Sequence, residues 1–256
     1  MILINLFLGF FILTLIFIPL EKIFFVRKQK IFRVAIFTDI TYFFLGKFIG
    51  ILGGKISIFC ASLLLSIFNN FDLNLKINQL PIWLQIITAL LISDMGYYIA
   101  HRMSHEIPFL WRFHAIHHSV KEMDWLATVR IHPFDQIFTK LFQMIPLYFL
   151  GFNPEILAIY LLFCAGIGFF IHSNLNLKLG IFKYIIANPQ FHHWHHSIES
   201  QAYNKNYAAQ FPMIDLLFGT LYLPKNKIAT EYGITEYIPN NYFKQLIHPF
   251  ISHHKK

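Results

Sequence analysis

Long stretches without charged residues restrict the fold of this chain more than any other feature. Residues 1–20, 56–71, 77–93 and 156–177 contain no Asp, Glu, Lys or Arg. A transmembrane helix needs about 20 mostly apolar residues, within a range of about 17–25. The first and last stretches reach this length, and the other two reach it with a short extension. The sequence therefore predicts an all-α integral membrane bundle of about four membrane segments, including a hairpin, with a cytoplasmic helical His-rich cap.

Composition and charge agree with this prediction. Hydrophobic residues make up 56% of the 256 residues and charged residues only 13%. Residues 1–20 lack a basic start and a small-x-small cleavage site, so we interpret them as a retained helix and not as a signal peptide. Under the positive-inside rule, the basic cluster that follows lies in the cytoplasm: Lys22, Arg27, Lys28, Lys30 and Arg33. Nothing in the pattern of basic residues indicates nucleic-acid binding.

The first third of the chain is expected to cross the membrane three times, starting from an amino terminus outside. The first helix covers residues 2–20. Residues 35–68 are interrupted by Asp39, Lys47 and glycines, so we expect an interfacial turn followed by one span. The spacing of Gly46, Gly50 and Gly54 allows close helix approach, and a local loop or kink explains it equally well. Residues 69–81 form an external loop, and residues 82–100 return to the cytoplasm.

The character of the sequence changes after residue 100. Residues 101–140 are polar enough for an aqueous environment, and 141–171 are apolar again but broken by GFNPE at 151–155. Each arm is short for a full crossing, so we expect a helical hairpin that enters or crosses the membrane and returns. The chain then divides into N-terminal membrane helices over 1–89, a histidine-rich domain with the hairpin over 90–224, and a cytoplasmic tail over 225–256.

Most of the 14 histidines fall into three short motifs. HRMSH places His101 and His105 four residues apart, and two HxxHH motifs contribute the rest: His114, His117, His118, His192, His195 and His196. Positions i, i+3 and i+4 share one face of a helix, so each motif presents its imidazoles together. Imidazole is a ligand for Zn, Cu, Fe and Ni. Eight imidazoles are too many for one ion and suit two. His172, at the end of the hairpin, is the best candidate for a ninth ligand.

Other polar residues are candidates for supporting these ligands. Asp94 lies two helical turns before His101 on the same face, where its carboxylate can accept the free N–H of a ligand histidine. His132 is either such a supporting group or a loop residue hydrogen-bonded before a proline. His193 lies about 100° round a helix from His192, so we expect it to be a supporting group or to face solvent. Asn204 and Asn206, shortly after the third motif, can also orient ligands.

These motifs and their surroundings resemble the fatty acid hydroxylase/sterol desaturase superfamily, whose members are membrane di-iron oxygenases with HxxxH, HxxHH and HxxHH boxes. The resemblance covers roughly residues 90–224 and includes the segments DMGYYIAHRMSHE, LWRFHAIHHS, VRIHPFD, NKNYAAQF and LLFGTLYLP. The family often has NYG after the third box. Here Asn206 and Tyr207 are followed by Ala208, a departure that affects a turn and not the metal site.

The resemblance implies a ligand set and a reaction. The iron ligands would be His101, His105, His114, His117, His118, His172, His192, His195 and His196. Two Fe ions would use O2 to oxidise an unactivated C–H bond of a fatty acyl or sterol-like lipid, giving an alcohol. Electrons must come from outside, because the chain has no GxGxxG fingerprint and only two cysteines. A ferredoxin, cytochrome or flavin reductase is therefore an expected partner.

Two alternatives remain open at this stage. The same site could desaturate a lipid or cleave an ether lipid as a monooxygenase, because the outcome depends on how the substrate lies relative to the metal. A zinc-binding membrane protein or metal transporter without redox chemistry is a third hypothesis. A transporter places polar residues near the bilayer midplane, whereas these histidines are expected at the cytoplasmic margin, so the oxygenase is favoured.

Overall fold

The computed structural model describes residues 2–67 and 76–251, and within these ranges every regular element is a helix. Four helices are long and apolar enough to cross a membrane: α1 (Ile2–Ile23), α2 (Ile36–Ile67), α3 (Ile82–Glu106) and α6 (Pro154–His172). This confirms the all-α class and about four membrane segments, but the second arm of the hairpin, expected to be short for a full crossing, is by itself long enough to span. Outside the helices, isolated β-bridges join Phe25 to Leu175 and Ser197 to Tyr232.

The second membrane segment differs from the prediction. The interfacial turn expected early in 35–68 is wrong, because α2 is one continuous helix of 32 residues. Its glycines serve packing instead, since a Cβ atom at Gly50 would lie 3.5 Å from Gln136 and one at Gly53 would lie 3.4 Å from Lys140, both on α5 (Pro133–Phe149). Gly54 has nothing within 4 Å of such an atom. Most of the external loop expected at 69–81 lies outside the described residues, and Lys76–Gln79 form a 3-10 helix.

The hairpin is formed by α5 and α6. It begins at Pro133, earlier than the expected 141, because α5 takes up the polar turn that follows His132. Gly151, with φ 75°, makes the tight turn between the arms, and the Asn153 side chain caps α6 by accepting from Glu155 N–H. The hairpin crosses α3 closely at Gly96, where an added Cβ atom would collide with the Phe142 carbonyl. Only glycine permits this approach.

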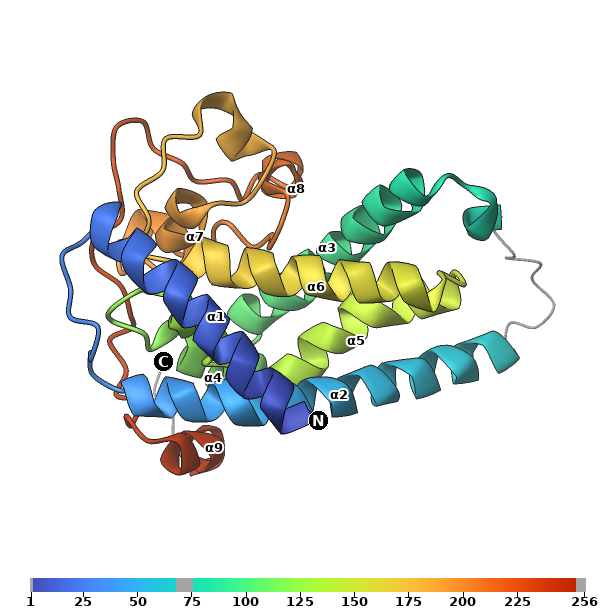
Figure 1. Cartoon of the computed structure of the whole chain (residues 1–256), viewed down its shortest axis with the longest axis horizontal. Helices are drawn as coiled ribbons and strands as arrows, with labels where there is room; N and C mark the ends of the chain where they lie inside the picture. Colours follow the sequence, from blue (N-terminus) through green and yellow to red (C-terminus); the bar gives the residue numbers. More distant parts are fainter. Residues whose placement is uncertain (1, 68–75, 252–256) are drawn as a thin grey trace.

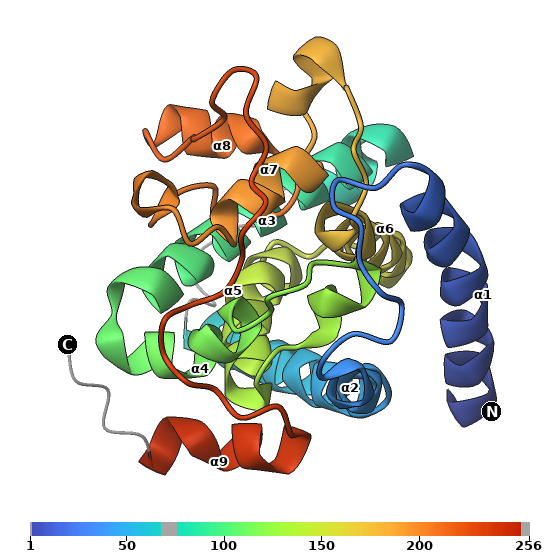
Figure 2. The ribbon, with the colours of Figure 1, turned by 90° about the vertical axis from the view of Figure 1, so that its left-hand side faces the viewer.

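Short helices and loops cover one end of the long helices, at the left of Figure 1. The helices of this end are α4 (Pro108–His118), α7 (Pro189–His195), α8 (Pro212–Leu217) and α9 (Tyr242–Ile251). Proline stands at the first position of α4, α5, α6, α7 and α8, where its missing N–H removes no helical hydrogen bond. Figure 2 shows this end facing the viewer, with α7 and α4 gathered around the end of α3. All three histidine motifs lie here.

Candidate metal centre

The nine histidines expected as ligands come together as two buried clusters. A five-histidine cluster contains His101, His105, His114, His118 and His195, and a four-histidine cluster contains His117, His172, His192 and His196. In each cluster, one ring nitrogen per residue lies within 4.8 Å of all the others. The clusters adjoin, because the rings of His118 and His196 stack with centroids 4.3 Å apart. Two neighbouring ions with five and four nitrogen ligands fit this arrangement.

The HxxHH motifs are shared between the clusters. Residues four apart stay together, since His114 and His118 belong to one cluster and His192 and His196 to the other. The middle histidine of each motif, His117 or His195, joins the opposite cluster. The expectation that each motif presents all its imidazoles in one direction is therefore wrong for HxxHH. The side chains of adjacent residues point about 100° apart around a helix axis. α4 and α7 lie between the two clusters, so each helix contributes side chains to both.

Five of the nine rings are oriented by acceptors at Nδ1. His101 donates to the Tyr207 carbonyl, His117 to Arg130, His172 to Gly168 and His195 to Lys205, over 2.6–3.1 Å, while His114 donates to Asp135 Oδ2 over 2.9 Å. Each such bond assigns the proton to Nδ1 and leaves a lone pair on Nε2. Backbone carbonyls and a carboxylate are the usual acceptors behind metal-binding histidines.

The Nε2 atoms then meet in a way that hydrogen bonding does not explain. Those of His101 and His114 are 3.0 Å apart, and those of His117 and His172 are 3.2 Å apart, with a lone pair on every one. The Nε2 atoms of His105 and His195 are buried without a hydrogen-bond partner among the described residues. Converging lone pairs repel unless a cation lies among them. The donor set therefore fits two metal ions.

The protonation state agrees with metal binding. Burial lowers the pKa of His195 to about 3 and places the pKa values of His117, His118, His192 and His196 well below 6.5. The neighbouring imidazoles lower them further, because two positive rings at such short distances repel. These rings are neutral at pH 7, which is the form that binds a metal ion.

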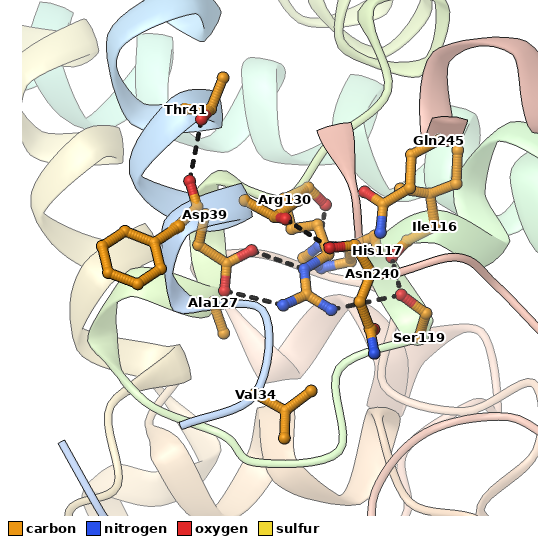
Figure 3. A network of polar contacts seen from close by, with 12 residues as sticks. Val34, Asp39, Thr41, Ile116, His117, Ser119, Ala127, Arg130, Asn240 and Gln245 are labelled. Carbon is orange, nitrogen blue, oxygen red and sulfur yellow. Dashed lines mark hydrogen bonds and ion pairs between the residues drawn. The ribbon is translucent and has the colours of Figure 1, made fainter. Parts of the chain in front are cut away.

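A buried ion-pair network supports the four-histidine cluster from the α2 side. The Asp39 carboxylate accepts from Arg130 over 2.6 and 2.8 Å and pairs with Arg33 over 2.7 Å. Figure 3 shows Asp39 facing the Arg130 guanidinium, with Ser119 on its other side and His117 beside it. Asp124 completes the network by accepting two bonds of 2.6 Å from Arg33. The carbonyl that orients His117 therefore belongs to a residue whose guanidinium is held by the Asp39 carboxylate.

Asp94 has a different role from the one expected. Its carboxylate accepts from the backbone N–H groups of Ala209, Gln210 and Phe211 over 2.8–3.2 Å, and no histidine is its partner in the described part of the chain. Asp215 accepts from the N–H groups of Tyr207 and Ala208 in the same segment. Together the two carboxylates fix residues 207–211, whose Tyr207 carbonyl orients His101. The support from Asp94 is thus indirect.

The other three candidate supporting residues, His132, Asn204 and Asn206, differ in what they contact. His132 caps α5 by accepting from Phe134 N–H and bonds the Leu246 carbonyl, so the loop reading applies and no hydrogen bond links it to either cluster in the described chain. Asn204 is an exposed turn residue with φ 57°. Asn206 is buried and donates to the carbonyls of Phe191 and Tyr222, which fixes the backbone beside His192.

His193 belongs to neither cluster, and it does not face solvent, because it is fully buried. Its Nδ1 atom lies 3.0 Å from the Tyr232 hydroxyl. Burial lowers its pKa to about 4, while the backbone of His172 and Ser173 opposes this shift by hydrogen bonding. The ring therefore joins α7 to the segment that carries Tyr232.

The acceptors behind the ligands were mostly missed by sequence reasoning. Asp135 stands in VRIHPFD and is not among the supporting residues expected from the sequence. Its position in the first turn of α5, after a histidine and a proline, is the one signal that could have selected it. The carbonyls of Gly168, Arg130 and Lys205 have no signal, because any residue type supplies a carbonyl.

Comparisons with known proteins agree with this centre. The chain is 36% identical over 173 residues to ornithine lipid hydroxylase OlsE of Rhizobium tropici, covering 68% of this chain and 52% of that protein. Human alkylglycerol monooxygenase is 33% identical over 159 residues, which cover 62% of this chain and 34% of that protein. Human cholesterol 25-hydroxylase is 26% identical over 137 residues, which cover 53% of this chain and 50% of that protein. The chain thus spans about half the length, or less, of these relatives.

No solved structure matches the chain. The family model described as fatty acid hydroxylase matches residues 86–220, which is more than half of the 256 residues. Every histidine of the two clusters falls within the matched region. On this match, the chain belongs to the fatty acid hydroxylase family.

Proposed function

We propose that this protein is a membrane-bound di-iron oxygenase that hydroxylates a C–H bond of a lipid. The observation that carries the proposal is the pair of adjoining clusters, in which five and four imidazoles direct ring nitrogens at two points. Nitrogen-rich ligation of this kind suits iron among the metals that bind imidazole. The relatives named hydroxylases and monooxygenases favour iron with O2 over a non-redox zinc site.

The proposed reaction inserts one oxygen atom of O2 into a C–H bond, and the other leaves as water after two electrons and two protons are delivered. Iron bound at the clusters supplies the reduction of O2 and the oxidising power that no side chain provides. The protein's own groups fix the ligand geometry through the Nδ1 acceptors, of which Asp135 is the charged one.

The electron donor is proposed to be a separate ferredoxin, cytochrome or flavin reductase. The two cysteines, Cys60 and Cys164, lie on different helices and cannot bind an iron–sulfur cluster. A pocket of about 480 Å³ leads from the surface to His105, His118 and His195, with Glu106 and Arg112 at its margin. This polar opening supports access for O2, protons and the donor from the aqueous side.

The metal centre is proposed to face the cytoplasm. The basic segment after α1 lies against the covering end of the bundle, since Arg27 donates to the Thr230 carbonyl and Gln29 to the Met123 carbonyl. The positive-inside rule assigns such a segment to the cytoplasm, and the clusters lie at the same end of the helices. A Lys28→Cys variant tests this orientation, through the accessibility of the new cysteine to a thiol reagent in intact vesicles.

A second candidate is oxidation of the carbon beside an ether oxygen, which yields an unstable product that breaks down to an aldehyde. The relation to human alkylglycerol monooxygenase, at 33% identity, favours it over desaturation. Product analysis separates the candidates. Purified protein with iron, a reductant and a lipid panel gives an alcohol under the main proposal, an aldehyde under the second and an alkene if the protein is a desaturase.

A further inference from the structure

A small chamber of mixed polarity adjoins the two clusters. It has a volume of about 240 Å³, and His114, His117 and His172 form part of its wall. Most of the remaining wall comes from α3, α5 and α6 and includes Lys140 and Gln143. Pockets for whole small molecules usually have volumes of about 300–1,000 Å³. The chamber therefore has room for one end of a lipid and not for a whole one.

A larger cavity adjoins this chamber. Its volume is about 590 Å³, it lies between α2, α5 and α6, and it shares Gln136, Lys140 and Gly168 with the chamber as a common wall. Its rim carries apolar side chains that are exposed in the isolated chain, Ile58 on α2 and Leu161 on α6, both in segments long enough to span a bilayer. The two spaces adjoin at these shared residues, with the larger cavity toward the exposed apolar rim and the chamber toward the histidines.

The charged side chains along this route are lysines, apart from Asp135 in the chamber. Lys47, Lys55 and Lys140 line the larger cavity, whose described wall contains no Asp or Glu. The chamber has a single carboxylate, Asp135, which is already bonded to His114. No ion pair or hydrogen bond of the Lys140 ammonium group is found among the described residues. A cation at such a depth is costly unless an anion neutralises it.

We propose that this route takes an anionic lipid head first, with its carboxylate or phosphate bound to Lys140 and its hydrocarbon chain trailing through the larger cavity into the bilayer. The inference rests on the proposed function and adds a substrate class and a site of oxidation to it. Because Lys140 and three of the ligand histidines line the same chamber, the oxidised carbon lies within the first few carbons from the headgroup.

Lys140 and its polar neighbours determine this orientation. Thr139, Gln143 and Gln136 of α5 line the chamber beside Lys140, while the α6 side of the chamber is largely apolar. An inserted methyl end would leave these groups and Lys140 without partners, at a free-energy cost for each. The larger cavity is bordered by Gly54 of α2, where an added Cβ atom would meet nothing within 4 Å, so this position leaves space for an alkyl chain.

The test is a binding measurement that needs no turnover. Purified protein is titrated with oleate, 1-oleoyl lysophosphatidate and neutral 1-monoolein, which share one hydrocarbon chain and differ in the headgroup. We expect at least one anionic lipid to bind about tenfold more tightly than monoolein, since a hydrogen bond to a charged group contributes that much. Lys140→Met should abolish the preference and Lys140→Arg should keep it. Lys244→Met, at an exposed position on α9, is the matched control and should behave like the wild type.

The outcomes separate this inference from the proposed function. Equal affinity for monoolein and both anionic lipids, or a preference that survives in Lys140→Met, overturns the inference even if the protein binds iron and oxidises lipids. A preference that depends on Lys140 supports it even if no oxidation is detected. With active protein, mass-spectrometric location of the new hydroxyl group is a second test. A hydroxyl beside the headgroup supports the proposed orientation, and one near the methyl end contradicts it.

Discussion

The imidazole of His117 donates from Nδ1 to the backbone carbonyl of Arg130 over 3.1 Å, while the Arg130 guanidinium is bound by Asp39 of α2. A ligand of the four-histidine cluster is thus oriented by a residue whose own position depends on a membrane helix 91 residues away in sequence. The ion-pair network and the metal centre are therefore mechanically connected, which leads to the first prediction.

Asp39→Asn should destabilise the fold and weaken metal binding at the four-histidine cluster. The substitution leaves Arg33 and Arg130 buried with one carboxylate fewer, and breaking a buried pair costs about 3–5 kcal/mol. Thermal unfolding and bound-metal analysis measure the two effects. Glu106→Gln breaks an exposed pair with Arg102 and is the control, expected to change stability by less than about 0.5 kcal/mol. Equal effects of both substitutions would contradict this account of the network.

His195→Ala and His193→Ala should have different consequences. His195 lies in the five-histidine cluster, so its loss should remove activity and reduce bound metal. His193 bonds Tyr232 outside both clusters, so its loss should lower the unfolding temperature while metal content stays near that of the wild type. Metal content per folded protein is the deciding measurement. If His193→Ala loses as much metal as His195→Ala, the assignment of His193 is wrong.

Asp135→Asn should weaken metal binding without unfolding the protein. Its carboxylate accepts the Nδ1 proton of His114, and removing such a partner commonly lowers metal affinity about 10–100-fold. Competition with a chelator of known affinity measures the change. Glu155→Gln, at an exposed position in the first turn of α6, should leave the affinity unchanged. An unchanged affinity in Asp135→Asn would show that the His114 orientation does not depend on this carboxylate.

Gly96→Ala should be far more damaging than Gly54→Ala. A Cβ atom at Gly96 collides with the Phe142 carbonyl, which is backbone and cannot move aside without separating α3 from α5. At Gly54 an added Cβ atom meets nothing within 4 Å, and alanine in a helix is favoured over glycine by about 1 kcal/mol. We expect poor recovery of folded Gly96→Ala and a Gly54→Ala protein at least as stable as the wild type. Similar behaviour of the two would contradict the close crossing.

The metal-free protein should lose stability on acidification. Burial lowers the pKa of His195 to about 3 in the folded state, against 6.5 in the unfolded chain. Below pH 6.5 the unfolded chain therefore binds a proton that the folded protein does not. Each such group lowers the free energy of unfolding by up to about 1.4 kcal/mol per pH unit. The unfolding temperature should fall between pH 7.5 and 5.5. A temperature that stays constant or rises would mean that the buried imidazoles are already charged.

The sequence predicts the membrane helices and the nine histidines because both depend on local patterns. Charge-free stretches indicate spans, and the repeated spacing of His114, His117, His118 and their counterparts indicates ligand helices. The sharing of each HxxHH motif between two clusters depends on where α4 and α7 lie relative to each other, and one motif alone does not contain that information. The three-part division at residues 89 and 224 stays a prediction, and the first boundary falls inside α3.

The supporting groups were harder to predict, and Asp94 shows why. Spacing placed it correctly on the face of α3 that bears His101, but three buried N–H groups of residues 209–211 compete for its carboxylate. Buried amides without partners are costly, so the carboxylate binds them. His101 finds a backbone carbonyl instead, at Tyr207. Such competition between distant segments is decided by tertiary structure and leaves no trace in residue spacing.

The most direct test of the central claim is the metal content of protein purified without oxygen and reconstituted with ferrous iron. Two irons per chain are expected, with consumption of O2 when a reductant and a lipid are added. His195→Ala should lose bound iron in the same measurement. One or two zinc ions per chain, with no iron uptake and no O2 consumption, would contradict the account of the two histidine clusters as a di-iron oxygenase centre.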